Sequence, residues 1–140
     1  ILGCDGVNNP DLVTIAGKEA VEGFYFTSPP LPGELTTASA RAFLAEFEQK
    51  TGKPAQSIDS ILAGEALRVI INTIRETKSS DPDVMAGYLH SWFVDDFGLT
   101  GRIRFNTKGD RLNDLYGIYR IDAKGAFAVQ RMFQFGQIVQ

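Results

Sequence analysis

The sequence lacks the features that mark several large classes of protein. It has one cysteine, Cys4, so it contains no internal disulfide and no cysteine cluster for a metal ion. No apolar run approaches the roughly 20 residues that cross a bilayer. The chain begins neither with Met nor with a basic and then apolar leader, and we therefore expect any secretion signal to lie outside these residues.

Motifs of catalysis are also absent. The sequence contains no Gly-rich phosphate loop and no G-x-S-x-G nucleophile turn. His90 is the only histidine, and it lies off the apolar stripe of its expected helix, which favours a solvent-facing residue over a positioned base. Cys4 has no base near it in sequence, so we expect a small buried residue at a strand end. No catalytic residue and no cofactor is predicted.

Acidic residues occur in pairs but without a metal-binding spacing. Asp95 with Asp96, and Asp110 with Asp114, lack the loop spacing and terminal Glu of calcium sites. We interpret them as solvated loop acids and predict no metal site. The formal net charge of −3 also argues against a nucleic-acid partner, for which a basic patch is expected.

What is present is an ordinary globular composition, with 44% hydrophobic and 22% charged residues over 140 positions. Three helices are predicted in the middle of the chain. The first follows Thr36 or Thr37 and ends at Gly52, and the second runs from about Ser60 to Lys78. The second has apolar residues on more than one stripe, so we expect it to be mostly buried.

The third predicted helix starts at Asp81-Pro82, because Asp caps free amides and Pro suits the first helical position. Its inner face is expected to consist of Val84, Met85, Tyr88, Leu89, Trp92 and Phe93. Strands are predicted at both ends of the chain, at 21–27, in Gly101-Arg102-Ile103-Arg104-Phe105, at 115–121 and at 127–135. The last two are joined by a short Gly-containing hairpin loop at 122–125. The fold class is therefore α/β.

One short stretch carries functional information before any resemblance is considered. Gly3-Cys4-Asp5-Gly6 follows an apolar start, and a strand that ends there leaves a carboxylate at a carboxyl-terminal sheet edge, where α/β sheets present ligand sites. The alternative is a turn in which Asp5 accepts its own backbone amides. Both interpretations remain open from the residues alone.

Five segments in order, GCDGV, IAGKEAVEGFYFTSP, ARAFLAEFEQKTGKPA, AGEALRVIINTIRET and FGLTGRIRFNTKGDRLNDLYGIYRIDAKG, resemble the carboxyl-terminal half of a type I periplasmic solute-binding protein. The subgroup is the branched-chain amino-acid (Leu/Ile/Val) family of ABC importers. The resemblance implies an α/β fragment of a two-lobed protein with parallel-sheet lobes. It implies that the chain was cut from a longer polypeptide and that it is soluble only with its missing half or by pairing with a copy of itself, for which exchange of elements is one route.

The resemblance also implies a division of the chain. Residues 1–27 and 115–140 are expected in one lobe and 34–105 in the other, with hinge crossings at 28–33 and 106–114. Proline stiffness and glycine flexibility suit hinges that bend without unravelling. The expected hinge residues are Pro29, Pro30, Pro32, Lys108, Gly109 and Asp110. The turn after Phe105 is then a passage between lobes and not a simple hairpin.

In such proteins a solute contacts both lobes and stabilises the closed state. The resemblance places Asp5, with its neighbour Gly6, where an acid pairs with the ammonium of an amino acid, although Asp is one methylene shorter than the Glu often found there. It places Asp59 at an apolar cleft position, which implies either a shifted alignment or a more polar solute. The alternative for Asp59 or Ser60 is a helix cap.

The resemblance thus implies a periplasmic or otherwise extracytoplasmic protein without catalysis, which captures an amino acid or a related small polar solute and delivers it to a membrane ABC permease. Two alternatives stay open. One is a ligand-sensing receptor or regulator on the same fold. The other is a small α/β enzyme of unrelated type that uses Asp5 and Cys4.

Overall fold

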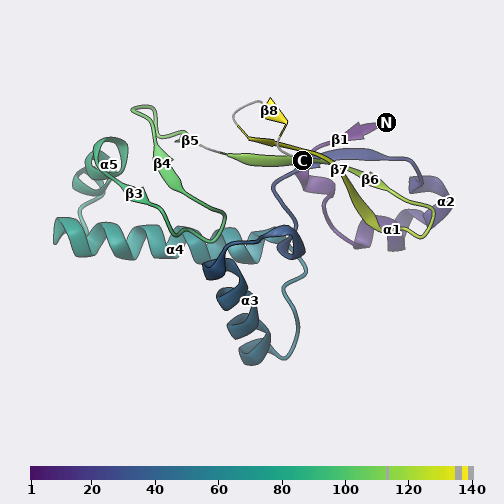
Figure 1. Ribbon diagram of the computed structural model, residues 1–140, viewed down its shortest axis with the longest axis horizontal. Helices are drawn as coiled ribbons and strands as arrows, with labels where there is room; N and C mark the ends of the chain where they lie inside the picture. The colour runs from purple at the N-terminus through teal and green to yellow at the C-terminus, as the bar shows by residue number, and fades with distance from the viewer. Residues whose placement is uncertain (113, 135–136, 139–140) are drawn as a thin grey trace. The chain divides into compact units, whose positions relative to one another are not determined.

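The computed structural model describes the backbone of residues 1–112, 114–134 and 137–138. It divides into two compact units: unit 1 is Ile1–Leu31 with Leu115–Gln140, and unit 2 is Pro32–Asp114. Figure 1 shows the elements of each unit along the chain. None of the helices in the described part of the chain has the length and apolarity needed to span a membrane.

Unit 1 is a sheet with short helical turns. Its strands lie in the order β1-β2-β6-β7-β8, and their bounds are β1 Leu2–Gly3, β2 Tyr25–Ser28, β6 Leu115–Ile121, β7 Phe127–Gln134 and β8 Gln137–Ile138. Its helical turns are η1 Asp5–Val7, α1 Asp11–Ala16 and α2 Lys18–Val21. Parallel pairing, expected for both lobes, is found among the described strands only between β1 and β2. The β6–β7 pair is antiparallel because its short loop cannot join parallel neighbours, and the β2–β6 and β7–β8 pairs are antiparallel as well.

The core of unit 1 forms on one face of this sheet. Phe26 stacks on Tyr119 with ring centroids 5.2 Å apart, and Val21 and Ile121 complete the buried cluster. The two predicted terminal strands and their loop are confirmed over the described residues, and Phe135 of the predicted second strand lies outside them. The strand predicted at 21–27 begins only at Tyr25, because α2 occupies the preceding residues up to Val21.

Unit 2 contains the three long helices, with bounds α3 Ala38–Thr51, α4 Ile58–Thr77 and α5 Pro82–Ser91. Its remaining elements are η2 Pro32–Glu34, β3 Val94–Asp95, β4 Ile103–Phe105 and β5 Arg111–Leu112. The predicted helices are all confirmed. Thr37 caps α3 by accepting from the Ala40 amide at 3.1 Å, and α3 ends at Gly52 in the left-handed region.

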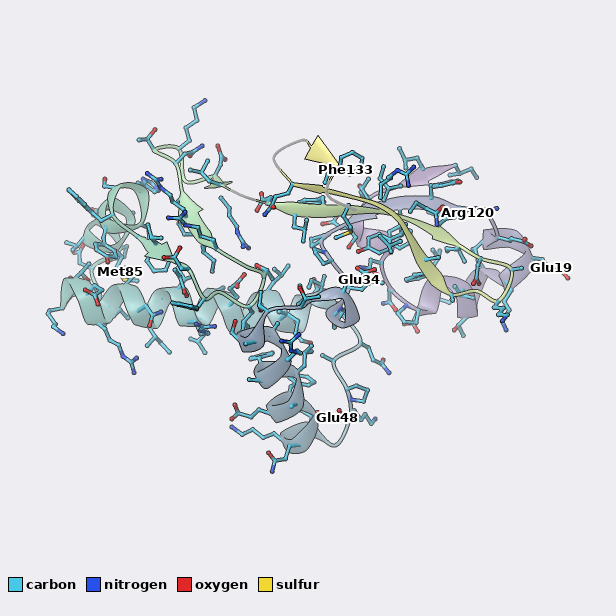
Figure 2. All side chains as sticks on the ribbon, viewed as in Figure 1. Glu19, Glu34, Glu48, Met85, Arg120 and Phe133 are labelled. Carbon is cyan, nitrogen blue, oxygen red and sulfur yellow. The ribbon has the colours of Figure 1, made fainter. Side chains whose placement is uncertain are left out.

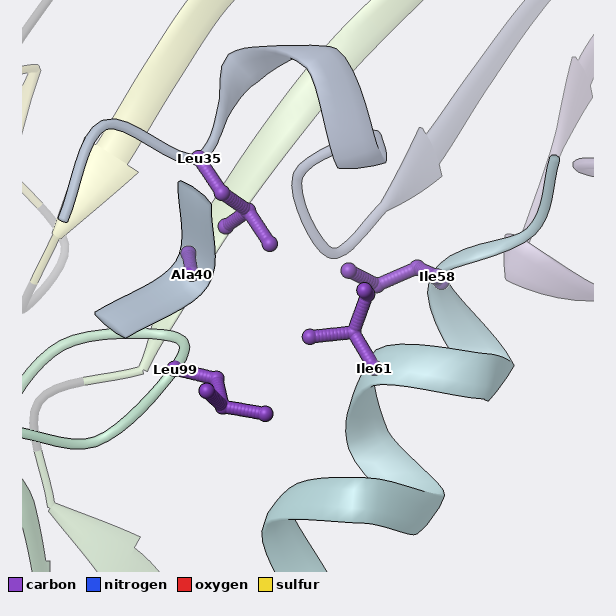
Figure 3. Packing of buried hydrophobic residues seen from close by; sticks show 5 residues of the cluster. All are labelled: Leu35, Ala40, Ile58, Ile61 and Leu99. Atoms are coloured by element: carbon purple, nitrogen blue, oxygen red, sulfur yellow. The ribbon is translucent and has the colours of Figure 1, made fainter. Parts of the chain in front are cut away.

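Caps also explain the bounds of the other two helices. α4 begins two residues before the predicted start because the Ser57 hydroxyl accepts from the Asp59 amide at 3.1 Å. α5 begins as predicted, with the Asp81 carboxylate accepting from the Asp83 and Val84 amides. The start of α4 packs on α3 and on the turn before β4. Figure 3 shows the buried side chains that meet there: Leu35, Ala40, Ile58, Ile61 and Leu99.

Two burial predictions are wrong. α4 buries the face that carries Ile61, Glu65, Val69 and Thr73 but exposes a second apolar face. That exposed face consists of Leu67, Ile70, Ile71 and Ile74, and we call it the α4 stripe. On α5, Tyr88 and Leu89 pack with buried Phe93, whereas Val84 and Trp92 are exposed. The sequence pattern predicts which residues of each helix are apolar, but it does not predict which apolar face other segments cover.

The turn after Phe105 also differs from the expectation. β4 pairs with β5 in antiparallel register, and the Asn106 amide bonds the Asp110 carbonyl at 2.9 Å. Lys108, Gly109 and Asp110 therefore lie in a simple hairpin inside unit 2, because the Asn106 side chain accepts from the turn amides and closes the loop locally. The division between units falls after Asp114 and, on the other side, after Leu31. Asn113, within the expected crossing, lies outside the described residues.

The other expected crossing contains the prolines. β2 ends at Ser28, and η2 starts at Pro32. Pro30 and Pro32 are buried and Pro29 is half-buried, so this segment is packed as well as stiff. The assignment of these residues to a hinge remains a prediction.

Candidate functional site

Asp5 is positioned by a tight turn directly after β1. Because β1 runs parallel to β2, with Gly3 opposite Phe26, Asp5 lies beyond the carboxyl end of this parallel pair. The turn is closed by the Asn8 amide, which bonds the Asp5 carbonyl at 2.8 Å. The Asp5 side chain is exposed, and it has no hydrogen-bond or ion-pair partner among the described residues. It is therefore an available anion and not a turn residue that caps its own amides.

Close packing fixes the backbone that leads to Asp5. A Cβ on Gly3 would lie 2.9 Å from both the Phe24 ring and the Val7 side chain. A larger residue there would displace the turn. Gly6, in contrast, is exposed, and a Cβ there would come no closer than 4.0 Å to the Cys4 sulfur. The turn is thus closely packed at Gly3, where it begins, and open to solvent around Gly6.

A side-chain hydrogen bond that the sequence did not reveal ties this turn to β2. Asn8 Nδ2 donates to the hydroxyl of Ser28 at 2.7 Å, and Ser28 is fully buried. The turn after β1 and the last residue of β2 are therefore fixed to each other. The only sequence signal was the Asn8-Asn9-Pro10 turn composition, which does not name the partner.

Cys4 is exposed, which corrects the prediction of a buried residue. The correction has a simple cause, because β1 is only two residues long and Cys4 lies after its end, in the turn. His90 is half-buried rather than fully solvent-facing, and its ring lies beside Gly109, where a Cβ would be 3.2 Å from Nε2.

Asp59 lies in the first turn of α4 and is exposed. Its carboxylate accepts from the Ser57 hydroxyl at 2.8 Å, so it belongs to the hydrogen-bonded start of the helix. Ser57, and neither Asp59 nor Ser60, is the cap residue itself. Asp5 and Asp59 belong to different units.

The acids that were interpreted as solvated loop residues all have side-chain partners, and that of Asp114 is Arg111 at 3.6 Å. Asp95 pairs with Arg68 at 3.5 Å and Asp96 with Arg102 at 2.9 Å. Asp110 accepts from Asn106 at 3.0 Å. Over the described residues, no three His, Cys, Asp or Glu side chains come together in a group that would hold a metal ion.

A buried charged cluster in unit 2 was not predicted. The Glu65 side chain is 5% exposed and pairs with Arg111 Nη1 at 3.1 Å. The Thr100 amide donates to Glu65 Oε1 at 2.8 Å, and the Thr100 hydroxyl donates to Oε2. Beside the pair lies an open, mainly apolar cavity of about 290 Å³, lined by Leu62, Glu65, Ala66, Val69, Ile70, Ile103, Phe105 and Arg111. Thr100 and Arg111 lie 35 and 46 positions after Glu65 in the sequence, so local sequence patterns could not reveal this cluster.

The Asp5 carboxylate lies beyond a parallel strand end and has no partner in the part of the chain that the structure describes. Such a group, in an α/β chain that folds as two units, suits a protein that binds a small molecule. The comparison with protein families gives the same class. Residues 3–126 match the family described as periplasmic binding protein, and the chain belongs to this family. It is a family of binding proteins and not of enzymes, in agreement with the sequence-based expectation. The comparison with curated proteins gives no match.

Solved structures of similar fold cover almost the whole chain. The leucine-binding protein LivK of Thermotoga maritima matches 95% of this chain with a TM-score of 0.80 and 26% identity, over 37% of its own length. LivJ of Streptococcus pneumoniae, a branched-chain amino-acid transporter substrate-binding protein solved with isoleucine, matches 96% of this chain with a TM-score of 0.74 and 21% identity, over 37% of its length. An ABC transporter solute-binding protein of Rhodopseudomonas palustris, solved with 3,4-dihydroxybenzoic acid, matches 95% with a TM-score of 0.69 and 14% identity, over 36% of its length. The chain therefore spans little more than a third of the structures it matches.

Proposed function

We propose that these 140 residues are part of a longer polypeptide, called the full-length protein below, which is the solute-binding component of an ABC importer. It captures an amino acid or a related small polar solute outside the cytoplasm and delivers it to a membrane permease. The family match over residues 3–126 supports this proposal, and so do the solute-binding proteins among the similar structures.

The proposed site rests on the carboxylate of Asp5, which is exposed and has no partner among the residues that the structure describes. A solute with an ammonium group would find there an anion held on a rigid turn, and a charge-assisted hydrogen bond is stronger than a neutral one. Gly6 leaves space beside it because it carries no side chain. We propose Asp5 and Gly6 as the contact that unit 1 makes with the solute.

Unit 2 contributes Asp59 in this proposal. The carboxylate accepts one hydrogen bond from Ser57 and retains acceptor capacity, since a carboxylate has about four lone-pair sites. An exposed carboxylate suits a polar group of the solute better than an isopropyl group. The preferred solutes are therefore more polar than leucine.

Capture proceeds by closure of two lobes, which correspond in this proposal to the two units. A solute that contacts both lobes binds the closed state more tightly and shifts the population toward it. The chain crosses between the lobes at 28–33, with Pro29, Pro30 and Pro32, and again at the end of unit 2 near Asp114.

A thermal-shift screen of the full-length protein tests the function. A solute that binds only the native state at 100 times its Kd stabilises it by about 2.7 kcal/mol, which raises Tm by several degrees. Amino acids, their amides and aromatic acids such as 3,4-dihydroxybenzoate form the panel. We expect a shift for at least one α-amino acid. A panel without any shift, for a protein that melts cooperatively, would contradict the proposal.

A further inference from the structure

Arg111 joins three parts of unit 2 at one point. Its Nη1 donates to Glu65 Oε2 at 3.1 Å and to the Thr100 hydroxyl at 2.6 Å. Its Nη2 donates to the main-chain carbonyls of Thr100 and Arg102, each at 3.4 Å. The guanidinium of Arg111 thus contacts the middle of α4 and the turn before β4. Because Arg111 itself belongs to β5, these contacts attach β5 to both.

The partner of Arg111 on α4 is nearly inaccessible to water. Glu65 accepts from the Thr100 amide and hydroxyl as well as from Arg111, so its oxygens are satisfied by groups of unit 2. Removing one member of a buried pair leaves the other charge without compensation, which is costly. The geometry of this cluster is therefore strongly determined.

The cluster lies at the end of unit 2 in the chain. Arg111 is three residues before Asp114, the last residue of that unit. Its Nε is buried without a hydrogen bond among the described residues, and the Asp114 carboxylate lies 3.6 Å from it. The guanidinium is thus fixed on one side by Glu65 and Thr100 and faces the departing chain on the other.

We propose that Glu65 and Arg111 are positioning residues that fix the point at which the chain leaves unit 2, so that closure on a solute bends the chain only after Asp114. The closure in this inference rests on the proposed function, but the fixation of the exit point rests on the contacts of Glu65 and Arg111 alone. Without the pair, β5 loses its attachment to α4, and the bend spreads back into the β4–β5 hairpin. The closed state then becomes less well defined, and solute affinity falls.

The test uses the full-length protein with the single variants R111M and E65Q and the double variant carrying E65L and R111M. The double variant removes both buried charges and replaces them with apolar groups, which restores stability in many buried pairs. Glu46→Gln is the matched control, because it breaks an ion pair with Lys50 of 2.6 Å that is exposed on α3. Each protein is measured for Tm, for the Kd of L-threonine and of 3,4-dihydroxybenzoate, and for amide hydrogen exchange at Leu112 and Leu115–Gly117.

We expect R111M to speed exchange at these amides at least tenfold relative to Phe26 and to weaken solute binding about tenfold or more. The double variant recovers Tm but keeps the fast exchange and weak binding, and Glu46→Gln matches wild type. If R111M lowers Tm while exchange at these amides and the Kd values stay at wild-type levels, the pair is only structural and the inference is overturned.

Failure of the proposed function gives a different pattern. If wild type binds neither probe, hydrogen exchange alone decides the inference. Faster exchange at Leu112 and Leu115–Gly117 in R111M supports the fixed exit point, and unchanged exchange overturns it.

Discussion

The ring of Phe43 on α3 occupies the space in which any side chain at Gly64 of α4 would lie. A Cβ on Gly64 would be 2.7 Å from two ring carbons. We therefore predict that Gly64→Ala destabilises the full-length protein, although alanine favours helix. Overpacking costs about 1–3 kcal/mol, more than the roughly 1 kcal/mol gained from helix propensity. Denaturant unfolding measures the free energy.

Gly87 of α5 provides the matched control for this helix substitution. A Cβ there meets nothing within 4 Å, so Gly87→Ala should stabilise the protein by up to about 1 kcal/mol. The two changes are chemically identical and opposite in sign. Equal changes in the free energy of unfolding at both positions would show that the Phe43 contact does not restrict residue 64 to glycine.

Neutralising Asp5 should weaken binding of any solute that carries an ammonium group. We predict that Asp5→Asn raises the Kd of the best α-amino acid from the screen by about 10- to 100-fold, as expected for the loss of a charge-assisted contact of about 1.5–3 kcal/mol. Tm without solute should stay near the wild-type value, because the carboxylate has no partner among the described residues. Isothermal titration calorimetry gives the affinity.

Asp11→Asn is the control for charge alone, since Asp11 is also an exposed acid of unit 1. It should leave the Kd unchanged. An Asp5→Asn protein that bound the amino acid as tightly as wild type would remove Asp5 from the site.

Much of the fold could be predicted because local signals determine it. Caps at Thr37 and Asp81, the left-handed end at Gly52 and the hairpin loop at 122–125 act within a few residues, and each appears where expected. The order of segments also sufficed to identify the periplasmic binding protein family. The resemblance implied a crossing at the Asn106–Asp110 turn, whereas local hydrogen bonds close a hairpin there.

The candidate site was predictable only in part. The position of Asp5 after a strand could be predicted, since that strand is continuous with the turn. The Asn8–Ser28 and Glu65–Arg111 contacts could not, because they join residues 20 and 46 positions apart. Burial of α4 was overestimated because an apolar helix face is visible in a sequence, but the segment that covers it is not.

Asp122 gives the β6–β7 hairpin a defined dependence on pH. Its carboxylate accepts from the Ala126 amide at 2.9 Å and the Lys124 amide at 2.8 Å, and these bonds hold its pKa below 3.8. Below pH 3.8 the unfolded state takes up a proton that the folded carboxylate still resists. The stabilisation is therefore complete above this pH and is lost as the pH falls through the lower, folded-state pKa.

We predict that Asp122→Asn removes this part of the acid sensitivity while keeping an oxygen acceptor for the two amides. The measurement is the difference in free energy of unfolding between wild type and variant, followed from pH 6 down to pH 3. The difference should be constant well above pH 3.8 and change as the pH falls below 3.8. If the difference is the same at every pH, the stabilisation by the hydrogen bonds of the Lys124 and Ala126 amides does not depend on the charge of residue 122.

The α4 stripe should behave in opposite ways in the 140-residue chain and in the full-length protein. Leu67 is 58% exposed and Ile71 39% exposed in this chain, on one face of a helix whose other face is already buried. Large exposed apolar patches promote association. We predict that the isolated chain self-associates and that replacing Leu67 and Ile71 together with Ser reduces the associated fraction, measured by size-exclusion chromatography with light scattering.

For the full-length protein we predict that the rest of the polypeptide covers the stripe. The same two substitutions should then destabilise it. Burial of one Leu or Ile side chain contributes about 1.5–3 kcal/mol, so the double variant should lose several kcal/mol of unfolding free energy. Val84→Ser, on the exposed part of α5, serves as control and should have little effect in either context. Two results would contradict this prediction: an isolated chain that is monomeric and melts cooperatively, or a full-length double variant that is as stable as wild type. Either result would show that the stripe is a solvent-exposed surface in the folded protein. An apolar face of that kind neither drives association nor contributes to folding.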